Sequence, residues 1–149
     1  MKLVMGSDHG GYRLKEELKA YLSGRNLEVT DVGTGSEDAV DYPGLALVVA
    51  EGVASGEYDR GILVCGTGVG MCMAANKVPG VRAALCHDVF SARASRAHND
   101  ANVLTLGARV IGPGLARAIV DVWLEQAFEG GRHARRVEQI RAIDEKYRR

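Results

Sequence analysis

Five short apolar runs recur along this chain, and a longer stretch with helical spacing or composition follows each of them. The apolar runs are residues 3–6, 27–32, 61–65, 82–86 and 103–106. The stretches that follow them are residues 12–22, 42–54, 71–76, 89–97 and 114–128. Such alternation builds parallel strands joined by right-handed helical crossovers, with ligands bound at the carboxyl ends of the strands. The pattern therefore predicts an α/β fold whose five-stranded parallel sheet is covered on both faces.

The size and charge of the chain narrow the class of protein. Its 149 residues, 46% of them hydrophobic, suit a single domain over 1–149. Basic and acidic residues balance at 19 each, so no overall field favours nucleic acid or an anionic membrane as a partner. No charged leader precedes the first apolar run and no run approaches about 18 apolar residues, so we expect a cytoplasmic protein. Three cysteines without CxxC spacing argue against a disulfide framework and a four-ligand zinc site.

The third apolar run ends in Cys65, and every second residue after it is a glycine, at positions 66, 68 and 70. Glycines let the backbone approach a ligand closely, and the first amides of the following helix are unpaired, so this loop is suited to an anion. The positive end of the helix favours a thiolate at Cys65, which makes it a candidate base or nucleophile near neutral pH. A buried core cysteine before an ordinary turn is the alternative.

A non-catalytic nucleotide-binding module is a further alternative for the same loop. The loop lacks the Gly-Lys-Ser/Thr ending of a phosphate-binding loop, and Met71 stands where a dinucleotide fingerprint has glycine. Asp88, however, lies at about the distance expected for an acid that binds a ribose. The alternative therefore stays open.

Polar residues also follow the first apolar run and the stretch 89–97. Asp8 and His9 come directly before two glycines, which favours a loop that holds a ligand close to the backbone, although a helix cap at Asp8 is the alternative. His98 titrates near neutrality and is a candidate general acid or base. Its alternative is a helix-capping role, and Asn99 tolerates the left-handed geometry of such a turn.

The last segment of the chain, approximately 130–149, is charged and carries only a narrow apolar stripe. We expect an arm that reaches a partner subunit, with a frayed surface helix as the alternative. Arg132 and Arg136 lie four residues apart and share a helix face, and Arg136 has no acidic residue three or four positions away. Two like charges near a helix N-terminus favour a bound phosphate between them, and a solvated charged face is the alternative.

Taken together, these residues resemble the ribose-5-phosphate isomerase B family, which also includes the galactose-6-phosphate isomerase subunits. The resemblance spans nearly the whole chain and rests on Gly6-Ser7-Asp8-His9-Gly10-Gly11, Asp41-Tyr42-Pro43, Cys65-Gly66-Thr67-Gly68-Val69-Gly70 with Ala74-Ala75-Asn76-Lys77, His98-Asn99-Asp100-Ala101-Asn102, and Glu129-Gly130-Gly131-Arg132-His133 with Arg136. It implies a Rossmann-like αβα sandwich. It also implies a homodimer or a dimer of dimers in which each active site is shared between subunits.

The resemblance also implies a role for each candidate residue. Cys65 resembles the base that moves the proton, and His98 resembles the acid that opens the sugar ring. The remaining implied contacts are substrate binding by Asp8 and His9, backbone amides for the enediolate from Gly66, Gly68, Val69 and Gly70 with Thr67 assisting, a pocket lining of Asn99 and Arg109, and phosphate binding by Arg132 and Arg136 of the neighbouring subunit. One branch of the family has a glutamate at the position of Met71, so this chain resembles the cysteine branch.

These inferences lead to one hypothesis for function. We expect an aldose–ketose isomerase that interconverts ribose 5-phosphate and ribulose 5-phosphate through a cis-enediolate and needs neither a metal nor an organic cofactor. The same mechanism on allose 6-phosphate, galactose 6-phosphate or a tetrose 4-phosphate is the first alternative, because the sequence does not reveal the depth of the pocket. Dependence on a different partner subunit is a second alternative, and the nucleotide-binding module is a third.

Overall fold

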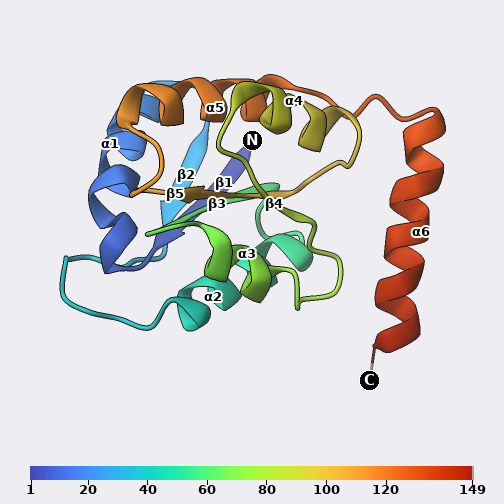
Figure 1. Ribbon diagram of the computed structural model, residues 1–149, viewed down its shortest axis with the longest axis horizontal. Coiled ribbons are helices and arrows are strands. Elements are labelled where there is room, and N and C mark those ends of the chain that lie inside the picture. Colours follow the sequence, from blue (N-terminus) through green and yellow to red (C-terminus); the bar gives the residue numbers. More distant parts are fainter. Residues whose placement is uncertain (149) are drawn as a thin grey trace.

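The computed structural model describes residues 1–148 and contains a sheet whose five strands all run parallel. The strands are β1 (Lys2–Ser7), β2 (Glu28–Asp31), β3 (Arg60–Cys65), β4 (Ala83–Leu85) and β5 (Val103–Gly107). Their order across the sheet is β2-β1-β3-β5-β4 (Figure 1). The predicted five-stranded parallel sheet is confirmed.

Helices cover both faces of this sheet. They are the short 3-10 turn η1 (His9–Gly11), α1 (Tyr12–Leu22), α2 (Tyr42–Ala54), α3 (Val69–Ala75), α4 (Val89–Ala97), α5 (Pro113–Glu125) and α6 (Arg132–Tyr147). Figure 1 shows α1, α4 and α5 on one face of the sheet and α2 and α3 on the other. This is the αβα sandwich that the alternating pattern predicts.

α3 and α5 each differ from the predicted range by more than one residue at one end, for a local reason. α3 begins at Val69 rather than at residue 71, because Gly68 adopts a left-handed backbone (φ 77°) that starts the helix directly after the loop. α5 ends at Glu125 rather than at residue 128, because Gln126 is extended and opens the linker to α6.

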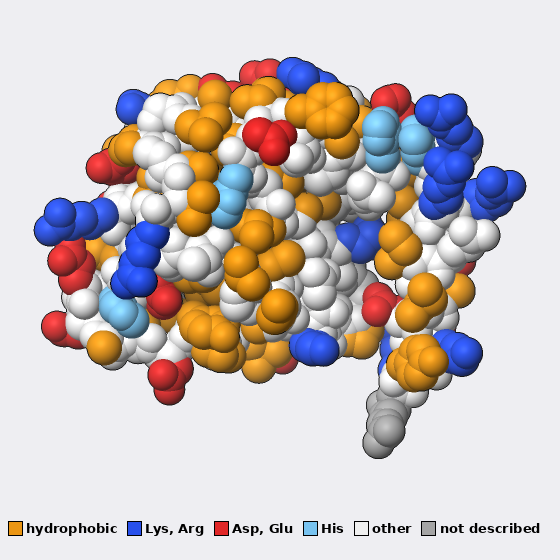
Figure 2. Space-filling view, viewed as in Figure 1, with side chains coloured by type: hydrophobic (Ala, Val, Ile, Leu, Met, Phe, Trp, Pro, Cys, Tyr) orange, Lys and Arg blue, Asp and Glu red, His pale blue; other side chains and the backbone are white. Residues whose placement is uncertain are grey.

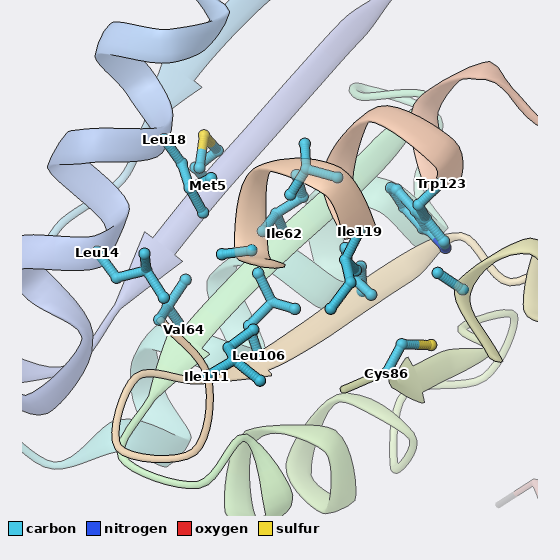
Figure 3. Packing of buried hydrophobic residues seen from close by; sticks show 14 of the residues in the cluster. Met5, Leu14, Leu18, Ile62, Val64, Cys86, Leu106, Ile111, Ile119 and Trp123 are labelled. Atoms are coloured by element: carbon cyan, nitrogen blue, oxygen red, sulfur yellow. The ribbon is translucent and has the colours of Figure 1, made fainter. Parts of the chain in front are cut away.

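The core has two layers, which follow from the alternation of side chains along the strands. Successive residues of a strand point to opposite faces, so Ile62 and Val64 pack under α1, α4 and α5, while Leu63 and Cys65 pack on α2 and α3. Figure 3 shows the first layer, in which Trp123 is completely buried. Burial of a side chain of this size contributes roughly 2–3 kcal/mol to folding.

The sheet topology places two strand ends beside each other. After β1 the chain builds β2 on one side of it and then crosses to β3 on the other side, so β1 and β3 form a switch point. In sheets of this kind, ligands bind at the carboxyl ends of the strands at such a point. Ser7 pairs with Val64, and the Asp8 amide donates to the Val64 carbonyl at 3.2 Å. The segments that follow Ser7 and Val64 are therefore neighbours.

Helix α6 stands apart from the two layers. Figure 1 shows it beside the β4 edge of the molecule, joined to α5 by an extended linker. No residue of α6 is buried, and the Gly80 amide donates to Asp144 Oδ2 at 3.2 Å across a cleft of about 360 Å³. None of the described helices combines the length and apolar character that a membrane crossing requires.

Candidate active site

Cys65 ends β3 on the face that α2 and α3 cover, and its residue is only 4% exposed. Its Sγ accepts a hydrogen bond from the Gly68 amide at 3.1 Å, because the left-handed backbone of Gly68 turns this N–H back toward the thiol. A charged sulfur accepts such a bond more strongly than a neutral one. The start of α3 adds the positive end of a helix at the same place. The sulfur of Cys65 therefore faces the glycine loop and lies beside the first turn of α3.

Cys86 is the contrasting cysteine. It is buried in the other layer of the core, and desolvation raises the pKa of its thiol to about 11. Cys86 therefore remains a neutral thiol at neutral pH. Of these two cysteines, only Cys65 has a sulfur that faces a backbone amide of the glycine loop.

The glycine loop is packed so tightly that side chains are excluded from it. A Cβ added to Gly68 would lie 2.5 Å from Cδ1 of Leu85, and one added to Gly70 would lie 2.5 Å from Cζ of Tyr42. The Val69 amide donates to Oγ1 of Thr67 at 3.3 Å. Among the described residues, the amides of Gly66 and Gly70 donate to no protein acceptor. The loop therefore offers free N–H groups to an anion.

The end of β1 faces this loop. Asp8 is 8% exposed, and its Oδ1 accepts from the Gly11 amide at 3.1 Å, so the capping role considered as an alternative is present. A Cβ added to Gly10 would lie 3.4 Å from Oδ1 of Asp8 and 3.5 Å from the amide nitrogen of Gly66. The Asp8 carboxylate and the Gly66 amide are therefore close to the same point. Capping η1 thus places the Asp8 carboxylate next to the loop. In this arrangement one residue both caps a turn and reaches the site.

His9 and Arg109 complete the group at this edge. Nδ1 of His9 accepts the Val40 amide at 3.2 Å, so the proton of the neutral ring is on Nε2, which can donate to a ligand. The Arg109 amide donates to the Gly66 carbonyl at 3.0 Å, and its guanidinium lies over Gly66, with Nε 3.5 Å from the position of an added Cβ. A fixed positive charge therefore lies beside the free amides of the loop.

Tyr42 is a site residue that the sequence reasoning did not assign a role. Its ring lies against Gly70, its residue is 39% exposed, and it is the first residue of α2. Tyr42 follows the end of β2 by eleven positions, so no strand-end rule places it at this edge. The only available signal was the Asp41-Tyr42-Pro43 motif.

His98, Asn99, Arg132 and Arg136 lie elsewhere in the same chain. α4 runs back to the amino edge of the sheet, so His98 at its end precedes β5, whose Val103 pairs with Gly61 near the start of β3. Cys65 is four residues further along β3, an advance of about 13 Å at roughly 3.3 Å per residue. Figure 2 shows two histidine side chains beside a group of Lys and Arg side chains over the upper end of α6. Within one chain, the candidate acid is therefore remote from the candidate base.

The α5–α6 linker and α6 surround the His98 side chain. Its Nε2 lies 3.8 Å from Oε1 of Glu129, and its ring stacks on that of His133 with centroids 4.2 Å apart. Burial and the neighbouring positive charges of His98 and Arg132 lower the pKa of His133. Arg136 also acts on His133 as a positive charge. The arm and the end of α4 thus form one cationic group.

The turn after α4 corrects one expectation. Asp100, not Asn99, is the left-handed residue, with φ 48°. Its carboxylate accepts from Arg96 at 2.8 Å, and this bond together with those from Arg82 holds the turn in place. The Asn99 carbonyl accepts from Nε of Arg82 at 3.2 Å. His98 is the C-terminal cap residue of α4, and its backbone amide donates to the Ala94 carbonyl. Its imidazole ring takes no part in this capping bond and stays available to a ligand.

Asp88 bears on the nucleotide-binding alternative. Its carboxylate accepts from the Ser91 amide at 2.6 Å and the Ser91 hydroxyl at 3.0 Å, so it caps α4. These bonds, led by the one from the Ser91 amide, lower its pKa. The carboxylate is thus committed to the helix, and the main sequence argument for a ribose-binding acid is lost.

A comparison with known protein families decides the class. Residues 3–140 match the model of the family described as Ribose/Galactose Isomerase. The chain belongs to this family. Ribose-5-phosphate isomerase B of Escherichia coli (strain K12) is 53% identical over 145 residues, which cover 97% of each chain. D-erythrulose-4-phosphate isomerase of Pectobacterium atrosepticum is 46% identical over 94% of this chain and 93% of its own.

A solved structure shows the same fold. The ribose-5-phosphate isomerase B of Clostridium thermocellum is 58% identical, covers 99% of both chains and superposes with a TM-score of 0.97. This member of the ribose/galactose isomerase family is therefore a sugar-phosphate isomerase, an enzyme of the aldose–ketose class. The choice between an enzyme and a nucleotide-binding module is thereby decided for the enzyme.

Proposed function

We propose that this isomerase interconverts ribose 5-phosphate and ribulose 5-phosphate through a cis-enediolate. The observation that carries this proposal is the pairing of a loop-bound thiol with free backbone amides at the β1/β3 switch point. Relatives and a solved structure that are named for this reaction, at 53% and 58% identity, support the choice of sugar. The chain over 1–149 acts as one isomerase domain, with an arm over approximately 130–149.

Cys65 is the base in this mechanism. Its thiolate takes the proton from C2 of the open-chain aldose, and the electron pair of that C–H bond forms the enediolate. The free amides of Gly66 and Gly70 hold the negative oxygen, with Thr67 assisting, and each such donor contributes on the order of 3 kcal/mol to the transition state. The proton of the C2 hydroxyl passes to O1, and the thiol returns its own proton to C1. These two transfers give the ketose and restore the thiolate. Neither a metal nor an organic cofactor is needed for this step.

Sugar phosphates are mostly cyclic, so the ring opens first. His98 protonates the ring oxygen while a polar group takes the proton of the C1 hydroxyl, and the carbonyl carbon is exposed. Asp8 and His9 border the loop and hold the substrate hydroxyls. Arg109 and Asn99 line the pocket, and Arg132 with Arg136 bind the phosphate as paired cations.

The separation of these residues supports a site that is built from two copies of the chain. The base and its amides lie at the carboxyl edge of the sheet, whereas His98 and the arm arginines lie at its amino edge. In addition, α6 leaves Ile140, Ile143 and Tyr147 exposed at 43, 59 and 71% along one face. An apolar helix face of this kind is suited to a second copy. We therefore propose a homodimer, alone or paired into a dimer of dimers, in which His98 and the arm of one copy complete the Cys65 loop of the other.

Mixed dimers test the shared site directly. Cys65→Ala and His98→Ala are each inactive as pure proteins, but a heterodimer contains one intact and one doubly defective site. When equal amounts of the two chains exchange at random, about half of the dimers are mixed, and each mixed dimer has one intact site out of two. The mixture is therefore expected to recover about one quarter of the wild-type activity. A site within one chain would give no recovery in the mixture. Size-exclusion chromatography with light scattering, done in parallel, shows whether subunits have associated.

A substrate panel tests the sugar. The purified chain is assayed with ribose 5-phosphate, allose 6-phosphate, galactose 6-phosphate and erythrose 4-phosphate, and kcat/KM is expected to be highest for the five-carbon sugar. Preference for the tetrose is the second candidate, because a relative that is 46% identical is named for a four-carbon sugar phosphate. That result would keep the mechanism and change the substrate. Silence on every sugar would indicate a missing partner subunit.

A further inference from the structure

Three ligand-type side chains converge at the junction of α4, the α5–α6 linker and α6. They are His98, Glu129 and His133, and one ligand atom from each lies within 4.8 Å of the others. Nε2 of His98 and Oε1 of Glu129 are 3.8 Å apart, and the two imidazole rings are stacked. This group lies outside the Cys65 loop, and its chemistry goes beyond acid catalysis by His98 alone.

The backbone holds these three residues together independently of their side chains. The Glu129 amide donates to the Ala97 carbonyl at 3.0 Å, which fixes the linker to the end of α4. The His98 amide donates to Ala94 at 2.8 Å, and the His133 amide donates to Gly130 at 3.0 Å. The side chains of His98 and Glu129 remain 44% and 52% exposed. The attachment points are thus fixed, while the exposed ends of the His98 and Glu129 side chains border solvent.

Two imidazoles and one carboxylate form a ligand set that Zn²⁺ takes in proteins, with water at the fourth position. We propose that His98, Glu129 and His133 bind Zn²⁺, and that the bound ion withdraws His98 from ring opening. The first half stands on the geometry of the three residues alone. The second half rests on the proposed function, in which His98 is the acid.

The geometry needs only side-chain movement to close around an ion. Zinc–nitrogen and zinc–oxygen bonds of about 2.0–2.2 Å place tetrahedral ligand atoms roughly 3.3 Å apart. The His98–Glu129 separation of 3.8 Å exceeds this by a small amount. The stacked rings have to tilt away from their interplanar angle of 13° so that both nitrogens face the ion. A hollow of about 160 Å³, lined in part by His98, Glu129 and Phe90, gives the ion a path from solvent.

The surrounding charges set the kind of ion and the strength of binding. Arg132 and Arg136 lie beside His133, and Arg93 lines the hollow. Among these groups, Glu129 is the negatively charged one, and the three arginines are positively charged. Nε of Arg132 lies 3.5 Å from Nε2 of His133 and points its N–H at the lone pair that a metal would use. A zinc ion therefore displaces this contact, and binding is moderate. Imidazole ligands favour zinc, nickel and copper over Mg²⁺ and Ca²⁺, which prefer oxygen ligands.

Competition with a chromophoric zinc chelator, in buffer without phosphate, tests the site. The wild-type chain is expected to take up one Zn²⁺ and no Mg²⁺. His133→Ala and Glu129→Gln should each weaken zinc binding by about tenfold or more, since losing even an outer partner of a metal site has such an effect. Both side chains are exposed or half-buried, and thermal melting verifies that the variants stay folded.

Two matched controls separate this site from other zinc ligands in the chain. The first control is His87→Ala. Because Nε2 of His87 already accepts a hydrogen bond from the Gly107 amide, removing this histidine should leave zinc binding unchanged. In Cys65→Ala, the thiol of the glycine loop is removed, and zinc binding should again be retained. Zinc uptake that survives His133→Ala, or that disappears in Cys65→Ala, would overturn the proposed ligands.

Turnover tests the second half of the proposal. Zinc should inhibit isomerisation with the same midpoint as its binding, EDTA should reverse the inhibition, and His133→Ala should need about tenfold more zinc. Binding without inhibition would overturn the withdrawal of His98. Failure of the proposed function would look different, because the zinc-free enzyme would then turn over none of the sugars while the binding results stood unchanged.

Discussion

Cys65 and His98 lie at opposite edges of one sheet. Cys65 ends β3 at the carboxyl edge, and His98 precedes β5, which starts opposite the first residues of the same strand. The proposed base Cys65 and the proposed acid His98 are therefore too far apart to act on one small sugar within a single chain. The dimer that we propose accounts for this separation, because in it each chain contributes one half of each of two sites.

Removal of the thiol is expected to abolish turnover without unfolding the protein. Cys65→Ala should lower kcat by roughly three orders of magnitude or more, because the proposed base is lost and the Asp8 carboxylate beside the loop is held by the Gly11 amide. Cys72→Ala, in α3 directly after the glycine loop, is the matched control and should retain activity. Steady-state kinetics and thermal melting of both variants check this. Near-normal turnover by Cys65→Ala would remove Cys65 as the base.

Loss of the arm arginines is expected to raise KM. In the arm, Arg141 and Arg148 pair with Glu138 and Glu145, whereas within the described residues Arg132 and Arg136 form no ion pair. Each arginine that binds the phosphate should raise KM by roughly tenfold with little change in kcat, since the phosphate is bound alike in ground and transition states. Arg135→Ala on the same helix is the control. An unchanged KM in the double variant would contradict phosphate binding.

A methyl group at position 70 is expected to damage the loop. A Cβ on Gly70 would lie 2.5–2.7 Å from the ring and hydroxyl of Tyr42, so Gly70→Ala should destabilise the protein by about 1–3 kcal/mol and lower kcat/KM. Gly114 is a matched control, because it is the second residue of α5 and Gly70 is the second residue of α3. A Cβ added to Gly114 meets no atom within 4 Å. Gly114→Ala should therefore be neutral or slightly stabilising. Urea unfolding compares the two, and equal effects would show that Tyr42 does not restrict position 70.

Stability below neutral pH is expected to depend on Asp31. Lys15 is completely buried, and its Nζ donates to Asp31 at 2.6 Å, as does Nζ of Lys19. Burial by itself raises the pKa of Asp31, but the hydrogen bonds from the two lysines and the Gly33 amide outweigh it and hold the pKa below its usual 3.8. A carboxylate with a lowered folded pKa stabilises the protein fully above its unfolded pKa and loses this effect as the pH falls through the folded value.

Asp31→Asn should therefore reduce the free energy of unfolding at pH 7 by about 2 kcal/mol. This loss is smaller than that for breaking a fully buried ion pair, because Lys15 still donates to Oε1 of Glu16 at 2.9 Å. The difference from wild type should shrink as the pH is lowered below 3.8. Urea unfolding across pH measures it, with Asp38→Asn, an exposed carboxylate, as the control. A difference that stays constant with pH would contradict the ion pair.

The local features of the site could be predicted because neighbours in the sequence produce them. The apolar run before Cys65 and the alternating glycines after it determine a strand, a tight loop and a helix start, and the loop is found as predicted. The start of α3 was missed by two residues because the left-handed backbone of Gly68 begins the helix earlier than its apolar pattern. Tyr42 was not assigned because its contact with Gly70 joins segments 28 positions apart.

The sequence by itself determined the parallel α/β sheet, the Cys65 loop and the family, since these depend on the spacing of residues within single strands, loops and helices. Only the tertiary structure decided which edge of the sheet each candidate residue occupies. The resemblance implied sites shared between subunits, with Arg132 and Arg136 from the neighbouring subunit, but it did not say which chain contributes His98. The direction of α4 places His98 at the edge of its own chain that is far from Cys65. The physical reason is that the run of a crossover helix across a sheet sets distances that spacing along the chain does not contain.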